Sequence, residues 1–151
     1  MASTVKRPVS EPRILIVGLG LIGGSLAAAL RAAGFGAGQE PSAGFGAAKE
    51  GAAGFGAGKE PSAGFGAAQE IVACDPDPGE IARGVEMGLI DGGATELSSV
   101  IEGASMVVLA VPVLAMRGVM VELARHLDRA APDVVITDVG STKAAIRDCA
   151  L

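Results

Sequence analysis

A glycine-rich turn between an apolar strand and a helix constrains the fold of this chain more than any other feature. Residues 14–17 are continuously apolar and run into the pattern Gly-x-Gly-x-x-Gly, after which apolar residues recur at helical spacing (Ile22, Leu26, Ala29 and Leu30). In such a unit the first glycine allows the tight turn, the second lets the backbone approach a phosphate, and the third lets the helix pack closely on the strand. The free N–H groups at the start of the helix attract the anion. The sequence therefore predicts a dinucleotide pyrophosphate site formed by Gly18, Leu19, Gly20, Leu21, Ile22 and Gly23.

The same stretch could instead be a membrane span, because residues 14–30 carry no charge. A spanning helix needs about 20 predominantly apolar residues, however, and this segment is shorter and interrupted by glycines. We therefore expect no membrane segment here.

Composition narrows the class of protein. The 151 residues amount to one domain, and the net charge of −5 with no Trp and no Tyr argues against a nucleic-acid-binding surface. Residues 1–13 lack the apolar core of a secretory signal. Cys74 and Cys149 show no metal-ligand spacing and are expected to be reduced thiols. From these features we predict a cytoplasmic protein without a metal site.

Residues 33–70 contain a low-complexity repeat. A ten-residue unit begins at residues 33, 43, 53 and 63 and holds every phenylalanine of the chain. Because each unit has few side chains that can be buried, we expect a flexible loop inserted into the domain, although regularly spaced phenylalanines could also contact a partner. Removing three units shortens the distance from Gly23 to Asp75 from 52 to 22 residues, close to the spacing of about 20 expected for a ribose-binding acid.

Asp75 is the candidate for binding the adenosine ribose. It follows an apolar strand over residues 71–74, and its carboxylate could accept hydrogen bonds from both ribose hydroxyls. The same charge would repel a 2′-phosphate, and residues 76–78 offer no Arg or Lys to bind one, which favours NAD over NADP. Alternatively, Asp75 caps a turn before Pro76.

Strand and helix patterns alternate through the remaining chain. Helices are predicted from Pro78 (burying Ile81, Val85 and Leu89), over residues 96–102, and after Pro112 (burying Met116, Val119, Met120, Leu123 and Leu127). Strands are predicted within residues 91–95, 106–111 and 134–138. This alternation predicts an α/β fold of the Rossmann type, a doubly wound parallel sheet in the order 3-2-1-4-5.

Two further residues are site candidates. Ser141 lies in a turn after the last predicted strand, where it could face the nicotinamide and substrate, or it or Thr142 could cap the helix that begins near Lys143. His126 is the only histidine of the chain and lies on a helix that runs away from the predicted crevice. We expect it to be an ordinary surface residue.

Five segments together resemble the prephenate/arogenate dehydrogenases of tyrosine biosynthesis: residues 18–27 (GLGLIGGSLA), 75–78 (DPDP), 88–91 (GLID), 110–113 (AVPV) and 137–143 (TDVGSTK). The resemblance implies an NAD-dependent oxidoreductase that removes hydride from the ring carbon bearing the hydroxyl group of prephenate or arogenate, with loss of carbon dioxide and aromatisation. It also implies that residues 18–23 hold the pyrophosphate, that Asp75 holds the ribose, that Val111 and Pro112 line the cofactor cleft, and that Ser141 faces the nicotinamide.

The sequence departs from that family after the Gly-Ser-Thr-Lys turn. Members carry a catalytic histidine in a later His-Pro segment, followed by a helical domain that closes the substrate pocket and forms a homodimer, and this sequence stops at Leu151. We therefore expect the NAD-binding part of such an enzyme, with no catalytic residue in this chain and no turnover by it alone. The alternative is a stand-alone NAD-binding or sensor module without catalysis.

Overall fold

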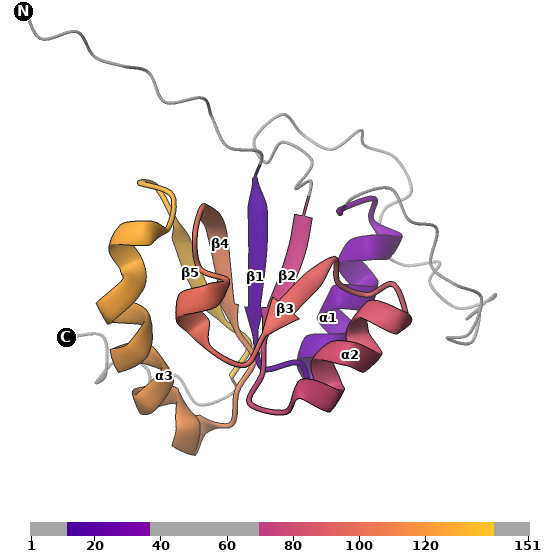
Figure 1. Ribbon diagram of the computed structural model, residues 1–151, viewed down its shortest axis with the longest axis horizontal. Coiled ribbons are helices and arrows are strands. Elements are labelled where there is room, and N and C mark those ends of the chain that lie inside the picture. Colours follow the sequence, from indigo (N-terminus) through magenta and orange to yellow (C-terminus); the bar gives the residue numbers. More distant parts are fainter. Residues whose placement is uncertain (1–11, 37–69, 141–151) are drawn as a thin grey trace, which may run out of the picture.

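Five parallel strands form one sheet in the order β3-β2-β1-β4-β5. The computed structural model describes residues 12–36 and 70–140. The strands are β1 (Arg13–Val17), β2 (Glu70–Cys74), β3 (Gly92–Ala94), β4 (Ala104–Leu109) and β5 (Val135–Asp138). Figure 1 shows α1 and α2 on one side of the strands and α3 on the other. The predicted α/β class, parallel pairing and strand order are confirmed.

Each strand of the sheet centre is apolar on both faces because both faces are covered. Leu15 and Val17 of β1 pack with Met116 on one face, whereas Ile14 and Ile16 pack with Ala27 on the other. This explains why β1, β2 and β4 are continuous apolar runs rather than alternating ones.

Helix α1 (Leu21–Ala32) forms where the apolar spacing predicts a helix, but only part of that spacing faces the sheet. Gly23, Ala27 and Arg31 are its buried residues, and Leu26 and Leu30 are only partly buried. Ile22 is 58% exposed and Ala29 is exposed, so the apolar spacing indicates the helix but not its buried face. The helix lies so close to the glycine turn that only small side chains fit beneath its first two turns.

The other helices follow the prediction in part. Helix α2 (Pro78–Glu86) begins at Pro78 as expected, but it buries Gly84 and leaves Val85 44% exposed, because Leu19 and Ile90 fill the space over Gly84. The helix predicted over residues 96–102 is only a 3-10 turn, η1 (Leu97–Ser99).

After β4, the chain enters α3 (Val113–His126) at Pro112, as predicted, and a second 3-10 turn, η2 (Leu127–Arg129), follows α3. Met116 and Leu123 of α3 are buried, and the remaining predicted core residues on this stretch are partly buried: Val119, Met120 and Leu127.

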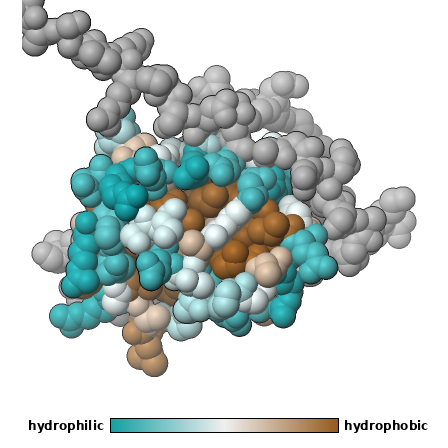
Figure 2. All heavy atoms as spheres, viewed as in Figure 1, coloured by the Kyte–Doolittle hydropathy of each residue, from teal (hydrophilic) through white to brown (hydrophobic). Residues whose placement is uncertain are grey.

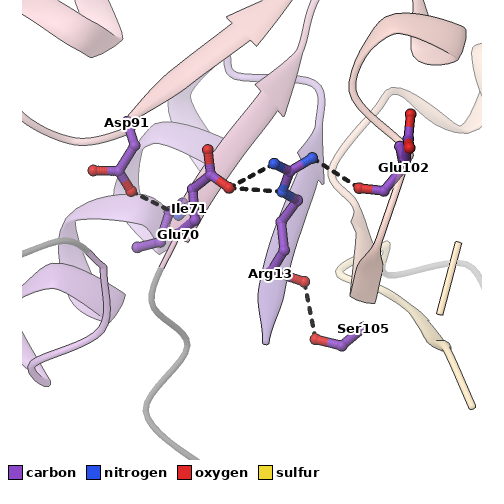
Figure 3. A network of polar contacts seen from close by, with 6 residues as sticks. All are labelled: Arg13, Glu70, Ile71, Asp91, Glu102 and Ser105. Carbon is purple, nitrogen blue, oxygen red and sulfur yellow. Dashed lines mark hydrogen bonds and ion pairs between the residues drawn. The ribbon is translucent and has the colours of Figure 1, made fainter. Parts of the chain in front are cut away.

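A polar network joins three strands at the amino-terminal edge of the sheet (Figure 3). The Arg13 guanidinium pairs with the Glu70 carboxylate at 2.7 Å and donates to the Glu102 carbonyl oxygen, and Ser105 Oγ donates to the Arg13 carbonyl oxygen. Nearby, the Ile71 N–H donates to Asp91 Oδ2. These contacts hold the start of β2 in register with β1, directly after the repeat-containing segment.

Some expectations concern residues that the structure does not describe. The repeat-containing loop of residues 33–70 falls almost wholly between the two described ranges, and Ser141 and Cys149 lie beyond the second. Within residues 12–36 and 70–140, no helix has the length and apolar character needed to cross a bilayer.

Candidate functional site

A cavity of about 1010 Å³ lies where the carboxyl ends of the strands meet. Seven of the residues predicted to bind the cofactor line it: Gly18, Gly20, Leu21, Ile22, Asp75, Val111 and Pro112. Leu19 and Gly23 lie behind them, with the Leu19 side chain 4% exposed in the core. The structure thus brings the glycine turn, Asp75 and the Val111–Pro112 segment together around one space.

The glycine turn has the geometry that its sequence predicts. Gly18 has φ +91°, and a Cβ built there would lie 2.8 Å from the Ala110 carbonyl oxygen. A Cβ on Gly23 would overlap the Gly18 carbonyl oxygen, so α1 can approach β1 only through a glycine. At Gly20, by contrast, a Cβ would meet nothing within 4 Å. A Cβ at Gly20 would therefore lie in open space, and Gly20 itself lines the cavity.

The start of α1 is suited to an anion. Gly20 precedes the helix, no described side chain caps it, and its first turn has no acidic residue. The first backbone N–H groups of a helix have no partner within the helix and carry the positive end of its dipole. Leu21 and Ile22, which form this first turn, line the cavity. A phosphate group placed here would accept hydrogen bonds from these N–H groups.

Asp75 links the turns that follow β1 and β2. Its side chain is buried, and its two carboxylate oxygens accept hydrogen bonds from the N–H groups of Leu19 at 2.7 Å and Asp77 at 2.9 Å. Through the second contact Asp75 caps the turn, as the alternative prediction has it. The N-cap of α2 is a different residue, Asp77, whose side chain accepts a hydrogen bond from the Gly79 N–H. A carboxylate has about four lone-pair sites, so two accepted bonds leave capacity for ribose hydroxyls.

Cys74 forms part of the cavity wall beside Asp75 and is a free, buried thiol. Burial, and secondarily the negative charge of Asp75, raises the pKa of Cys74 to about 11. The side chain is therefore a neutral thiol near pH 7, and a thiol is a far weaker nucleophile than a thiolate.

The cavity continues into a slot between η1 and α3. The residues of this part are Thr95, Glu96, Leu97 and Ser98 on one wall and Ala115, Val119 and Glu122 on the other. Sequence reasoning missed the polar members of both walls. The spacing of residues 115, 119 and 122 places them on one helix face, but nothing in the sequence indicated that η1 would lie opposite that face.

His126 does not line the cavity. Its Nε2 lies 3.0 Å from Glu122 Oε1, and Arg125 pairs with the other oxygen of Glu122 at 3.1 Å. The hydrogen bond with His126 and the charge of Arg125 lower the pKa of Glu122. Among the described residues, no group of three His, Cys, Asp or Glu side chains could hold a metal ion.

Hydrophobic side chains gather in hollows in the middle of the face seen in Figure 2, and hydrophilic ones surround them. The first turns of the two helices that border the cavity also carry exposed leucines. Leu21 at the start of α1 is 89% exposed, and Leu114 at the start of α3 is 99% exposed.

Comparison with known proteins gives consistent matches. The model of a family described as prephenate dehydrogenase, nucleotide-binding domain, matches residues 64–150. Prephenate dehydrogenase of Aquifex aeolicus, crystallised with hydroxyphenyl propionate and NAD+, is 24% identical with a TM-score of 0.61, over 95% of this chain and 40% of that one. A second crystal structure from A. aeolicus is 24% identical with a TM-score of 0.58, over 90% and 38%. Synechocystis arogenate dehydrogenase is 25% identical with a TM-score of 0.61, over 91% and 36%. The sequence thus spans about two fifths of the solved chains that it matches.

Proposed function

We propose that this chain, which belongs to the prephenate dehydrogenase family, binds NAD in the cavity at the carboxyl ends of its strands. The pyrophosphate would lie at the first turn of α1, and the adenosine ribose at Asp75. The A. aeolicus enzyme of the same fold was crystallised with NAD+, which supports the choice of cofactor. The observation that carries the proposal is the convergence of an uncapped helix start and a buried carboxylate on one cavity.

The carboxylate of Asp75 supports NAD over NADP. It is held in place by two backbone N–H groups, so it cannot move aside for a 2′-phosphate without leaving both N–H groups unpaired. Pro76 and Pro78 follow it instead of a basic residue that could bind the phosphate.

We further propose that the complete enzyme is an oxidoreductase that decarboxylates prephenate or arogenate. NAD, when bound, accepts the hydride. This chain's residues would bind and orient it: the first turn of α1 fixes the pyrophosphate, Asp75 fixes the ribose, and Val111 and Pro112 restrict the cavity on the β4 side. Ser141 is proposed to lie beside the nicotinamide and substrate.

The 151 residues alone are proposed to bind cofactor without turnover. Within the described chain the cavity wall has no histidine, and its thiol is protonated near neutral pH, so neither of these groups is there to act as base toward the substrate hydroxyl. Substrate closure and homodimer formation are proposed to require the further chain length that the solved relatives have. The free thiol of Cys74 supports a cytoplasmic location.

Titration with NADH tests this proposal directly. The chain has no Trp and no Tyr, so the fluorescence of bound NADH can be followed with little protein background. We expect saturable binding that NAD competes for, and NADP competing much more weakly. Exposed Asp133 lies outside the cavity wall, and its replacement by Ala serves as the control that should bind normally. Failure of NADH to bind at millimolar concentration would refute cofactor binding, and prephenate-dependent NADH production by the pure chain would refute the lack of turnover.

A further inference from the structure

We propose that a single ten-residue unit of the repeat suffices to join α1 to β2. Its Ala-Gly-Phe-Gly half, supplied by the first copy at residues 33–36, caps the end of α1. Its glutamate, supplied by the last copy as Glu70, is the first residue of β2. The units between these two halves are additions that the fold does not require. These residues lie away from the cavity, so the proposal goes beyond cofactor binding and does not depend on it.

The end of α1 has the hydrogen bonds of a Schellman motif, a common carboxyl cap of helices. The Phe35 N–H donates to the Leu30 carbonyl oxygen at 2.9 Å, six residues being closed by this bond. The Gly34 N–H donates to the Arg31 carbonyl oxygen, also at 2.9 Å. Gly34 follows the C-cap residue Ala33 and has φ +86°, the left-handed conformation that the motif requires there. The second residue of the repeat unit is therefore glycine for a backbone reason.

Phe35 gives the cap its hydrophobic contact. Its side chain packs against the core cluster on the α1 side of the sheet, and so does that of Leu30. A Schellman motif is frequently accompanied by such a contact between the residue after the left-handed glycine and the last turns of the helix. Every copy of the unit contains Ala-Gly-Phe-Gly, but only the first copy directly follows the helical spacing of residues 22–30. The first copy is therefore the one placed to cap α1.

Gly36 completes the contact of the unit with α1. It has φ +97°, and a Cβ there would overlap the Arg31 guanidinium. Glycine at this position lets the chain pass over a side chain that is only 4% exposed. That guanidinium donates to the Leu89 carbonyl oxygen and pairs with Asp91. The first four residues of the unit thus close over a buried ion pair.

Asp91 joins the two ends of the interruption at residues 37–69. Its Oδ1 lies 2.7 Å from Arg31 Nη2 at the end of α1. Its Oδ2 accepts a hydrogen bond from the Ile71 N–H at the start of β2, at 2.8 Å (Figure 3). Glu70, just before Ile71, pairs with Arg13 of β1. Both ends of the interruption are therefore held to the same carboxylate by residues outside it.

A single unit would make a connection of ordinary length. Deletion of residues 37–66 removes 30 residues, the length of three units, and leaves every described residue in place. Residues 67–69 would then join Gly36 to Glu70, a stretch that can span up to about 14 Å. The whole connection between α1 and β2 would have seven residues, close to the usual range of about two to six. The shared contact with Asp91 keeps the two ends near each other, as so short a connection requires.

Thermal unfolding followed by circular dichroism tests the proposal on the wild-type chain, the deletion chain, Phe35→Ala and Phe45→Ala. Phe45 is the matched control, because it has the same place in the second copy of the unit. The deletion should not lower Tm by more than about 1 °C, since a shorter connection costs less closure entropy. Phe35→Ala should lower Tm by about 3 °C or more, as for the loss of a half-buried aromatic side chain. Phe45→Ala should change Tm by less than about 1 °C.

Phe35→Ala in the deletion chain gives the sharpest comparison. It should lower Tm there as much as in the full chain, because no other copy contributes to the cap. A larger fall in the deletion chain, or equal effects of Phe35→Ala and Phe45→Ala in the full chain, would overturn the assignment of the first copy as the cap. A deletion chain that melts well below the wild type, or without cooperativity, would overturn the sufficiency of one unit. None of these outcomes requires NADH, so they hold whether or not the chain binds cofactor.

Discussion

Gly18 and Gly20 allow folding stability to be separated from cofactor binding. Gly18 has φ +91°, where an L-residue is strained by about 1–2 kcal/mol. A methyl group there would also lie 2.8 Å from the Ala110 carbonyl oxygen and 3.0 Å from Val111 Cγ1, and such overpacking costs about 1–3 kcal/mol. The reduced entropy of the unfolded chain offsets about 0.4–1 kcal/mol of this. We therefore expect Gly18→Ala to lower the free energy of unfolding by about 1–5 kcal/mol.

Gly20→Ala should behave in the opposite way. Gly20 has φ −49°, and a Cβ there would meet nothing within 4 Å, so the free energy of unfolding should stay within about 1 kcal/mol of the wild-type value. The methyl group would, however, enter the space proposed for the pyrophosphate. Exclusion of the anion from the helix start should raise the Kd for NADH at least about tenfold, equivalent to about 1.4 kcal/mol.

Urea unfolding followed by circular dichroism measures the free energy of unfolding, and NADH fluorescence titration measures the Kd. For a chain of this length, 2 kcal/mol also corresponds to a fall in Tm of about 4–8 °C. A Gly18→Ala variant as stable as the wild type would refute the steric argument. An unchanged Kd in Gly20→Ala would refute the position of the pyrophosphate, and equal destabilisation by both substitutions would refute the separation itself.

Three further predictions concern buried polar groups. The Arg31 side chain is 4% exposed, and its guanidinium contacts the Asp91 carboxylate at 2.7 Å. Asp91→Ala leaves this buried guanidinium without its carboxylate, and should lower the free energy of unfolding in urea by about 3–5 kcal/mol. A fall of less than about 1 kcal/mol would count against a buried pair. Asp75→Ala removes the acceptor of the Leu19 N–H, and should both destabilise the fold by about 1–3 kcal/mol and weaken NADH binding; an unchanged Kd would exclude a ribose contact. The pKa of Cys74 is raised to about 11 from its ordinary 9.0, so the folded chain holds this proton more tightly than the unfolded chain. The resulting stability is complete below pH 9 and is lost as the pH rises from 9 to 11. Between pH 8 and pH 10.5, the free energy of unfolding in urea should therefore fall less in Cys74→Ala than in the wild-type chain. An equal fall in the two proteins would contradict this.

The central strands β1, β2 and β4 could be predicted from the sequence because each lies in a continuous apolar run. Such runs are typical of a parallel sheet covered on both faces, and the strand order follows from the handedness of the connections. The buried face of α1 could not be predicted in the same way. Apolar spacing pointed to Ile22 and Ala29, whereas the close approach at Gly23 turns Ala27 and Arg31 toward the sheet. A helix that packs through a glycine buries small residues, and hydropathy alone does not detect this.

The site was predicted where it follows the chain and missed where it depends on tertiary packing. Asp75 follows β2 directly and Pro112 lies shortly after the end of β4, so the pattern of elements predicts both at the carboxyl edge. Glu122 lines the same cavity from α3, and residues of η1, a 3-10 turn where the sequence predicts a longer helix, line it as well.

The connection between α1 and β2 and the cavity lie at opposite edges of the sheet. The domain can therefore contain 33 residues, 37–69, between the described parts of its first helix and second strand without a change at the cavity. The chain leaves at Gly36 and returns at Glu70, on the amino-terminal edge, whereas the cavity lies at the carboxyl edge. At the point of return, Glu70 pairs with Arg13 and the Ile71 N–H donates to Asp91, so residues outside the interruption set the register of β2 against β1. That register in turn places Cys74 opposite Val17, and hence Asp75 within hydrogen-bond distance of the Leu19 N–H. We expect a fivefold change in the length of this connection to change the free energy of unfolding by about 1.4 kcal/mol, the closure entropy of a flexible loop, and to leave the geometry between the glycine turn and Asp75 unchanged.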